Sequence, residues 1–324
     1  MFPHLRANLW LLCTTLVLCC VVYPLILWAF GQTFFPEQAE GSLVRNADGK
    51  LIGSRLIAQP FSKDEYFQPR PSAASYKADA SGASNWGASN ALLRDRVARQ
   101  LGPMLKYRSG PHQAQPVAAD VEAWFKTKPN IVAEWAEAHE SAAKAWVNAD
   151  DKHKDAVTQW QNSHPAEVAK WKEANPDSVD SGPADLAKAF FTNNAPAFHA
   201  SWPKLVEDSN WSIAAVYFDM WLQEHQDQAQ HLEHVPADMV MASGSGLDPH
   251  ITLQNALFQL DRVAQKWAET AKRDEASVHR EIETLVREKT EAPFGGLVGV
   301  ELVNVLELNL ALRNRFGPAG GLTK

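Results

Sequence analysis

The chain has 324 residues, of which 45% are hydrophobic and 21% are charged, with 31 Lys and Arg against 38 Asp and Glu. This composition is too apolar for a disordered protein, and the length suffices for about two domains. The net charge of −7 leaves no broad basic face for phosphates and argues against nucleic acid as a partner. Cys13, Cys19 and Cys20 all lie in the first twenty residues, which excludes a disulfide framework or a cysteine zinc site further on.

The amino-terminal segment has the length and composition of a membrane-spanning helix. No charged residue occurs between Ala7 and Pro36, and residues 9–30 are almost wholly apolar. About 20 such residues span a bilayer as a helix, whereas a cleaved signal peptide has an apolar region of only about 7–15 residues before a small-x-small site. We therefore predict a single transmembrane helix.

The charges around this helix predict its orientation. Arg6 precedes it and the first charges after it are acidic, so the positive-inside rule places the amino terminus in the cytoplasm. The bulk of the chain then lies outside, which in a bacterium is the periplasm. Pro24 lies within the helix and is expected to end or kink it near Tyr23, a shape that suits packing against other helices.

The two regions that flank the middle of the chain predict a mixture of strands and helices. Residues 37–102 are rich in Gly, Ser, Asn and Arg and are expected to form strands and ordered loops, with a hairpin over residues 43–52. Residues 235–324 predict a loop over 243–249, helices over 252–271 and 275–289, a strand over 300–305 and a helix over 306–313.

The middle segment, residues 103–234, differs in composition and contains a repeat. It carries 11 Lys and Arg against 19 Asp and Glu, with eight of the 12 Trp and eight of the 11 His. The repeated pattern is Val121-x2-Trp124-x4-Pro129-x2-Val132-x2-Trp135, which recurs 36 residues later from Val157 to Trp171. A degenerate third copy runs from Phe191 to Trp202. A helix that ends after the first Trp and a second helix opened by Pro would explain the pattern, so we predict stacked helical hairpins.

Apolar positions after Pro129 predict one continuous helical stripe in this segment. Its members are Val132, Trp135, Ala136, Ala142, Ala143, Trp146 and Val147. Such a Trp stripe predicts a helical core rather than a ligand-stacking or metal site. The tightest His cluster, His225, His231 and His234, predicts an exposed helix end.

Catalytic motifs are hard to find. The sequence has no phosphate loop, no nucleophile elbow, no His-Glu-x-x-His and no Asp-Lys-Thr-Gly. Ser243 and Ser245 stand near Asp248 and His250 and could in principle be nucleophiles. Capping of backbone N–H groups by Asp248 or a serine suits the same loop better. We therefore predict no catalytic residue and no metal ligand.

Several short motifs occur in order outside the middle segment. They are Gly41-Ser42-Leu43-Val44, residues 53–59, 66–73 and 81–85, Val235-Pro236-Ala237-Asp238, residues 242–248, Gln259-x2-Arg262-Val263-Ala264 and residues 303–312. Together with Tyr23-Pro24-Leu25 in the preceding helix, these motifs closely resemble the C subunit of the Kdp potassium-transporting P-type ATPase. The resemblance covers residues 1–102 and 235–315, and residues 103–234 depart from it as a long insertion.

The resemblance implies a single-pass protein of the bacterial inner membrane. Residues 1–36 would be the cytoplasmic amino terminus and transmembrane anchor. Residues 37–102 and 235–324 would form one discontinuous periplasmic α/β domain, interrupted by an acidic, all-α, Trp-rich helical repeat insertion at 103–234. The implied partners are a channel-like potassium-binding subunit, a catalytic P-type ATPase subunit and a small single-helix subunit, besides membrane lipid.

The implied role is accessory and non-catalytic. Members of the family support assembly of the pump and are described as chaperone-like subunits that raise the affinity of the catalytic subunit for ATP. The predicted topology separates the soluble domain from cytoplasmic ATP, so we predict no cofactor on this chain and expect the complex to handle ATP and potassium. A membrane-anchored periplasmic binding protein that uses the Trp-rich repeats and an anchored periplasmic serine enzyme remain open as alternatives.

Two sets of site residues follow. The candidates for partner contact are Tyr23, Pro24, Arg70, Pro71, Ser72, Ser81, Gly82, Ser84 and Asn85. The family-motif residues are Ser243, Gly244, Ser245, Gly246, Asp248, Asn304 and Asn309. It is equally open at this point that the loop residues only hold the domain together.

Overall fold

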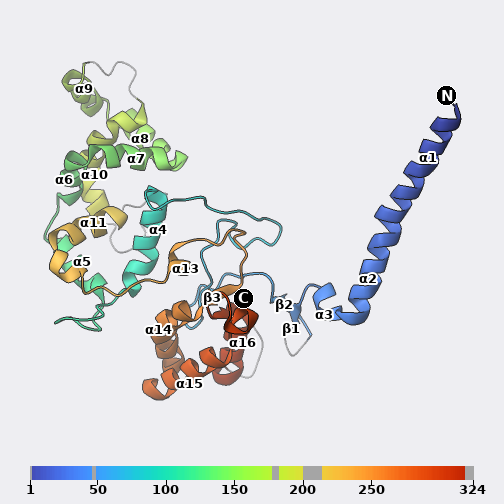
Figure 1. Cartoon of the computed structure of the whole chain (residues 1–324). Coiled ribbons are helices and arrows are strands. Elements are labelled where there is room, and N and C mark those ends of the chain that lie inside the picture. The colour runs from blue at the N-terminus through green and yellow to red at the C-terminus, as the bar shows by residue number, and fades with distance from the viewer. Residues whose placement is uncertain (1, 46–48, 177–181, 200–213, 318–324) are drawn as a thin grey trace. The chain divides into compact units, whose positions relative to one another are not determined.

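The computed structural model describes residues 2–45, 49–176, 182–199 and 214–317, and the chain divides into two compact units (Figure 1). Unit 1 comprises Met1–Ser84 and Pro236–Lys324, and unit 2 comprises Asn85–Val235. The limits of the insertion at 103 and 234 stay a prediction.

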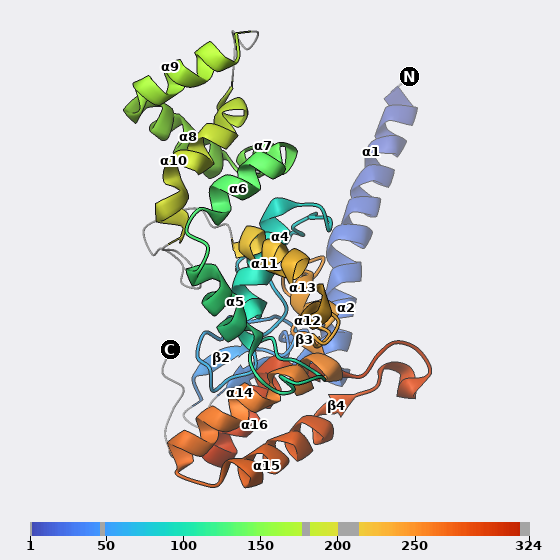
Figure 2. The same cartoon turned by 90° about the vertical axis from the view of Figure 1, so that its left-hand side faces the viewer.

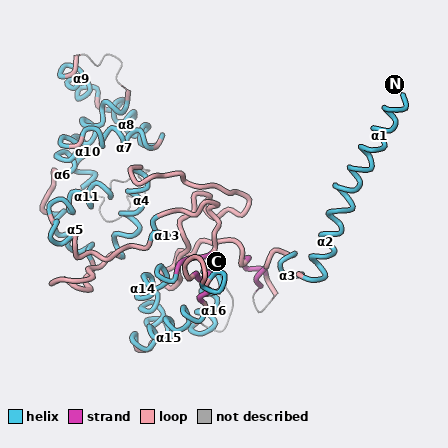
Figure 3. Tube along the Cα trace, viewed as in Figure 1, coloured by secondary structure: helices cyan, strands magenta, loops and turns pink. Residues whose placement is uncertain are grey.

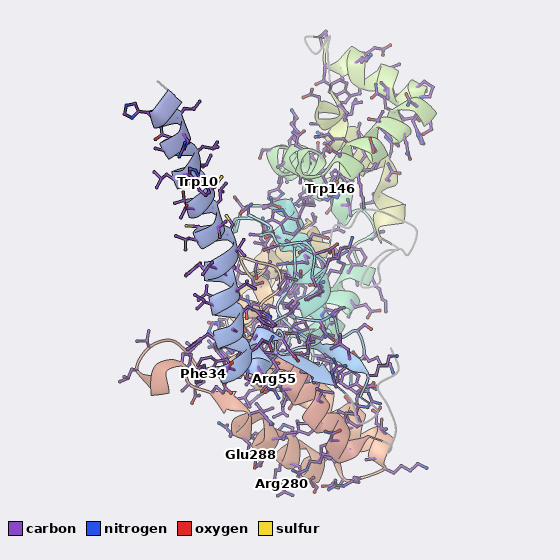
Figure 4. All side chains as sticks on the ribbon, turned by 90° about the vertical axis from the view of Figure 1, so that its right-hand side faces the viewer. Trp10, Phe34, Arg55, Trp146, Arg280 and Glu288 are labelled. Atoms are coloured by element: carbon purple, nitrogen blue, oxygen red, sulfur yellow. The ribbon has the colours of Figure 1, made fainter. Side chains whose placement is uncertain are left out.

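One continuous helix forms the start of the chain, as α1 (Phe2–Val17), the π-helical turn η1 (Leu18–Val22) and α2 (Tyr23–Phe34). The span His4–Phe34 is long and apolar enough to cross a membrane, and its side chains point outward into open space (Figure 4). The helix does not end near Tyr23. Instead the Tyr23 N–H donates to the Leu18 carbonyl five residues back, and this wider turn accommodates Pro24, which has no N–H of its own.

The remainder of unit 1 combines helices with two small antiparallel sheets. The elements are α3 (Pro36–Ala39), β1 (Leu43–Arg45), β2 (Leu51–Ser54), α13 (Ala237–Val240), β3 (His250–Thr252), α14 (Leu253–Ala271), α15 (Glu275–Glu288), β4 (Thr290–Glu291), η4 (Pro293–Gly296), β5 (Leu302–Asn304) and α16 (Val305–Phe316). β1 pairs with β2, which confirms the predicted hairpin, and β5 lies between β3 and β4. The strands are short and the connections long (Figure 3).

Side-chain caps define where the main helices of unit 1 begin. Thr252 Oγ1 accepts from the Asn255 N–H, Asp274 caps α15 and Asn304 caps α16. The predicted helices over 252–271 and 275–289 are confirmed by α14 and α15. These two helices pack side by side (Figure 2). The buried core they share with α16 and the sheet includes Ile251, Leu260, Val263, Trp267, Val278, Ile282, Val303, Leu308 and Leu312.

Within its described residues, unit 2 consists of helices joined by loops and turns, with two isolated β-bridges and no strand. The helices are α4 (Ala91–Leu101), η2 (Gly102–Met104), α5 (Val117–Lys126), α6 (Ile131–Ala138), α7 (Glu140–Ala149), α8 (Asp151–Ser163), α9 (Pro165–Ala174), η3 (Pro183–Leu186), α10 (Ala187–His199), α11 (Ala214–Glu224) and α12 (Gln226–Ala229). The expectation of strands and loops up to residue 102 was wrong for α4. Asn90 caps this helix and Leu93, Ala98 and Leu101 bury its apolar face.

A recurrent Trp-x3-His element ends helices in unit 2. His139, His164 and His225 each stand at a helix end with φ near −125° and ψ near 50°, and each ring stacks on the Trp four residues earlier. Each His is also the N-cap residue of the next helix. The predicted stripe after Pro129 does not lie on one helix, because the chain breaks at His139 into α6 and α7; six of its seven residues are buried as predicted, and Ala142 is exposed.

Four described Trp side chains of unit 2 lie in its buried core. Trp135, Trp146, Trp160 and Trp221 are between 1% and 7% exposed. Phe190 and Phe191 of α10 make edge-on ring contacts with three of them: Trp135, Trp146 and Trp160. The third repeat copy cannot be compared in full, because Trp202 lies outside the described residues.

Candidate functional site

Two loops far apart in the sequence meet in unit 1. The Ser72 hydroxyl donates to the Gly246 carbonyl at 2.5 Å. The Gly82 N–H and the Ser81 hydroxyl both donate to the Ser245 carbonyl, at 3.0 and 3.3 Å. The predicted contact loops therefore lie directly against the family-motif loop.

Gly246 permits this close approach. Its φ is +71°, and a Cβ atom there would lie 2.9 Å from the Gly82 carbonyl oxygen and 3.1 Å from Ala74 Cβ. Any larger residue would strain the backbone and push the two loops apart. Gly244, in the same loop, has nothing within 4 Å of its Cβ position.

An ion pair joins the same two loops. Arg70 Nη1 lies 3.3 Å from Asp248 Oδ2, and both side chains are about one-third exposed. The other carboxylate oxygen of Asp248 accepts from the His250 N–H at 3.0 Å and faces His250 Nδ1 at 3.3 Å. Hydrogen bonding from His250 and the nearby Arg70 charge hold the pKa of Asp248 below its ordinary value.

Buried amide side chains hold the segment that leads into these loops. Asn309 on α16 accepts from the Phe67 N–H and donates to the Phe67 carbonyl, both at 2.9 Å. Gln259 on α14 does the same for Gln68, at 2.8 and 3.0 Å. This extended segment thus receives from side chains the hydrogen bonds that a neighbouring strand would supply.

We call these two pairs of bonds, from Asn309 to Phe67 and from Gln259 to Gln68, the amide clamps. The Gln259 side chain also belongs to a buried polar network. Its amide donates to Asn255 at 2.7 Å, and Asn255 donates to Asp238 at 2.9 Å. Asp238 also accepts from the Thr252 N–H at 2.8 Å. Each of these buried polar side chains thus has a hydrogen-bond partner. The network therefore favours one arrangement of α13, α14 and the segment at Gln68.

A second polar joint lies between the end of the N-terminal helix and the core of unit 1. Arg55 pairs with Glu37 of α3 and with Glu307 of α16. Asn304, besides capping α16, donates to the Arg55 carbonyl at 2.8 Å. These contacts fasten the residues just after the membrane helix to the core of unit 1.

The structure brings part of the predicted site together. The cluster contains Arg70, Ser72, Ser81, Gly82, Ser243, Ser245, Gly246 and Asp248, with Pro71 half-buried beside Arg70. Gly244 is exposed at the edge of the loop, Ser84 is half-buried at the end of unit 1, and Asn85 is exposed at the start of unit 2 with φ +54°. Tyr23 and Pro24 belong to the membrane helix, and Asn304 and Asn309 to α16 and its cap. Tyr76 was not among the predicted residues, yet its hydroxyl donates to the Arg70 carbonyl at 2.9 Å.

The two serines act as backbone caps in this arrangement. Ser243 Oγ accepts from the Asp248 N–H at 3.4 Å, and Ser245 Oγ accepts from the Leu247 N–H at 3.1 Å. Within the described part of the chain, His250 pairs with Asp248 and with neither serine. The cluster is therefore built to fix loop conformation.

The His residues of unit 2 have structural partners as well. His225 stacks on Trp221, His231 Nδ1 lies 2.9 Å from the Ser109 hydroxyl, and His234 is exposed beside Arg108. Among the residues that the structure describes, no group of three or more His, Cys, Asp or Glu side chains is placed to hold a metal ion.

Comparison with known families identifies the chain. The model of the family "K+-transporting ATPase, c chain" matches residues 5–123 and 204–314, which is more than half of the sequence. The chain belongs to this family. The residues that match the K+-transporting ATPase c chain family include the N-terminal helix, both loops of the cluster and the Asn309 and Gln259 side chains that hold Phe67 and Gln68. The match enters residues 103–234 from both sides and leaves residues 124–203 outside.

Several relatives are named potassium-transporting ATPase KdpC subunit. That of Pseudomonas aeruginosa strain PAO1 is 48% identical over 111 residues, 34% of this chain and 61% of the relative. That of Gloeobacter violaceus is 53% identical over 79 residues, 24% of this chain and 42% of the relative. That of Leptospira interrogans is 27% identical over 297 residues, 92% of this chain and 86% of the relative. The chain thus spans about three fifths or less of the first two relatives.

Proposed function

We propose that this chain is the accessory C subunit of an ATP-driven potassium uptake pump, and that it supports assembly and activity of the catalytic subunit without hydrolysing ATP itself. The family match on both sides of residues 124–203 carries the proposal. Its partners would be a channel-like potassium-binding subunit, a catalytic P-type subunit and a small single-helix subunit. The anchor would place unit 1 on the periplasmic face of the inner membrane.

The internal bonding of unit 1 supports a mechanism based on a rigid body. The loop cluster and the amide clamps hold the loops of unit 1 on its core, and the Arg55 joint restricts motion between that core and α3, which follows the N-terminal helix. A rigid domain can favour one conformation of its neighbours only by binding that conformation more tightly than others. We therefore propose that the subunit acts by such differential binding, and that ATP and potassium are bound elsewhere in the complex.

The burial of the Trp side chains argues against a free-standing binder that uses the repeats. Trp135, Trp146, Trp160 and Trp221 offer almost no surface to a ligand. The serine-enzyme alternative loses support because Ser243 is only 4% exposed and its hydroxyl caps the Asp248 N–H. We propose instead that residues 103–234 form a helical appendage of the accessory subunit.

Co-purification in mild detergent tests the proposed function. The chain is expressed with an affinity tag beside the other pump subunits, and the recovered proteins are identified. The expected result is recovery of the catalytic and channel-like subunits with ATP hydrolysis that depends on potassium, and loss of that activity when this chain is omitted. Recovery of the chain alone would contradict the proposal.

A further inference from the structure

Large apolar side chains that are exposed occur in few places in the described chain. Outside residues 5–35 they are Leu43, Leu51, Leu56, Met241, Leu297, Val298 and Val300. All of these residues belong to unit 1, and none lies within the described part of unit 2. The exposed apolar surface is therefore confined to the unit that carries the membrane helix.

Three of the four most exposed of these residues lie in one loop between β4 and β5. Leu297 is 87% exposed, Val298 is 64% exposed and Val300 is 60% exposed. In Figure 2 the segment after β4 runs outward from the body formed by α14 and α15. Residues 293–300 contain no charged side chain, and we call them the docking loop.

The backbone of the docking loop turns at three glycines and starts from a fixed base. Gly295, Gly296 and Gly299 have φ values of +68°, +85° and +89°, which favour glycine. At the base, Glu291 of β4 pairs with Leu302 of β5 in the three-stranded sheet. The loop is thus a curved apolar segment presented by a rigid frame, and a contiguous exposed apolar patch of this kind marks an interaction site.

The residues around the loop discriminate between possible occupants. Glu291 and Glu301 flank the loop and are exposed, and Arg287, Glu288 and Lys289 are exposed just before β4, so the charges of these five residues sum to −1. Residues 290–301 contain no Lys, Arg, Trp or Tyr, the residue types that anchor loops at a lipid surface. The acids would be repelled by anionic lipid, and in a symmetric pair of loops they would face each other. An apolar pocket with basic groups at its rim fits the same charges.

We propose that the docking loop inserts Leu297 and Val298 into an apolar pocket with a basic rim on a partner subunit of the pump. This inference rests on the proposed function, since it assumes that pump partners exist. Burial of a single Leu or Val side chain strengthens binding about tenfold or more. The loop would therefore contribute a substantial part of the affinity between subunits.

The test compares three variants of the full-length tagged chain, each expressed with the other pump subunits. L297S/V298S removes the apolar contact, E291K/E301K reverses the rim charge, and L56S is the control. Leu56 is 60% exposed in the same unit but lies outside the loop. We expect both loop variants to recover about tenfold less partner protein than the wild type, L56S to match the wild type, and all four chains to melt at the same temperature.

Other outcomes would overturn the inference in distinguishable ways. If L297S/V298S recovers as much partner protein as the wild type, the proposed role of the docking loop is wrong and the proposed function stands. If the wild-type chain recovers no partner, both proposals are wrong. Purified wild-type chain is also mixed with vesicles of phosphatidylethanolamine and phosphatidylglycerol, and its mass is measured by light scattering. Vesicle binding, or a dimer, that L297S/V298S abolishes would assign the loop to lipid or to a second copy instead.

Discussion

The backbone N–H of Arg108 donates to the carbonyl oxygen of His231 at 2.8 Å, and the Glu233 N–H donates to the Lys106 carbonyl at 3.0 Å. These bonds pair the chain that enters the helical part of unit 2 with the chain that leaves it. Leu105, Tyr107 and Trp221 are buried just inside this pairing. The helices between these two segments therefore project from a closed base.

The closed base predicts that the outer helices can be removed. Trp124 Nε1 donates to Glu224 at 2.9 Å and Lys128 pairs with the same carboxylate, so α5 and its following turn contact α11 directly. α11 has 11 residues and spans about 16 Å, which a ten-residue linker of about 33 Å reach can bridge. We therefore expect that a ten-residue Gly/Ser linker can replace residues 129–213, because a connection of this length closes at little entropic cost.

The shortened chain should insert into the membrane, unfold cooperatively and recover pump partners as the full chain does. Circular dichroism should show a loss of helix that corresponds to α6–α10. A shortened chain that aggregates, or that no longer recovers partners, would show that the outer helices are needed for the fold or for assembly.

Gly246 and Gly244 form a matched pair of substitutions. Gly246→Ala forces a Cβ to 2.9 Å from the Gly82 carbonyl oxygen at φ +71°, and it should lower the free energy of unfolding by about 1–3 kcal/mol. Gly244→Ala meets nothing within 4 Å and should change it by less than about 0.5 kcal/mol. Urea unfolding of each variant in detergent measures the difference. Equal effects would show that the loops do not meet as described.

The Arg70–Asp248 pair can be separated from partner contacts by a double-mutant cycle. Because the pair is about one-third exposed, its coupling should be about 0.5–1 kcal/mol. Arg70→Ala and Asp248→Asn should each lower the melting temperature, and the double variant should lose less than their sum. If the effects on melting are negligible and Arg70→Ala instead reduces partner recovery, Arg70 contacts another subunit directly.

His153 should make the stability of unit 2 depend on pH. Its ring stacks on Trp146 with centroids 3.8 Å apart, and its Nδ1–H donates to the Trp146 carbonyl at 2.7 Å. Burial lowers the pKa of His153 from its ordinary value of 6.5, against the raising effects of that carbonyl and of Asp150 and Asp95. The unfolded chain therefore binds the proton more readily, so stability is fully present above 6.5 and falls as the pH drops toward the folded pKa.

Tryptophan fluorescence during thermal unfolding of the full chain checks this dependence. His153→Gln should melt lower than the wild type at pH 8 because it loses the ring stack, yet its melting temperature should decline less below pH 6.5. Replacement of the exposed His234 by Gln is the control for the change of side chain. An unchanged decline in His153→Gln would assign the pH dependence to other groups.

Local patterns predicted the parts of the fold that depend on neighbouring residues. The membrane helix, the β1–β2 hairpin, α14 and α15 each have a clear hydrophobic period or turn signal over their own length. α4 was missed because its flanking Gly, Ser and Asn residues dominate the composition, although Asn90 is a typical cap. β3 and β4 have only three and two residues, too few to show a period.

The contacts of the candidate site depend on residues far apart, and one sequence does not predict them. Arg70 and Asp248 meet through bonds between residues far apart in sequence, among them those by which Asn309 and Gln259 fix the backbone at Phe67 and Gln68. The break at His139 was missed for a different reason. It needs no Gly or Pro, since the His ring stacks on Trp135 and caps the helix, and the repeated Trp-x3-His spacing is the signal that would have revealed it.

The π-helical turn at Leu18–Val22 changes which sides of the membrane helix are continuous. One extra residue in a turn rotates everything before it by about 100° relative to everything after it. A stripe of side chains that faces one neighbour along α1 therefore resumes on a different side along α2. A helix built in this way can present separate faces to two neighbouring helices, one along α1 and one along α2, and Pro24 lies just after the point of change.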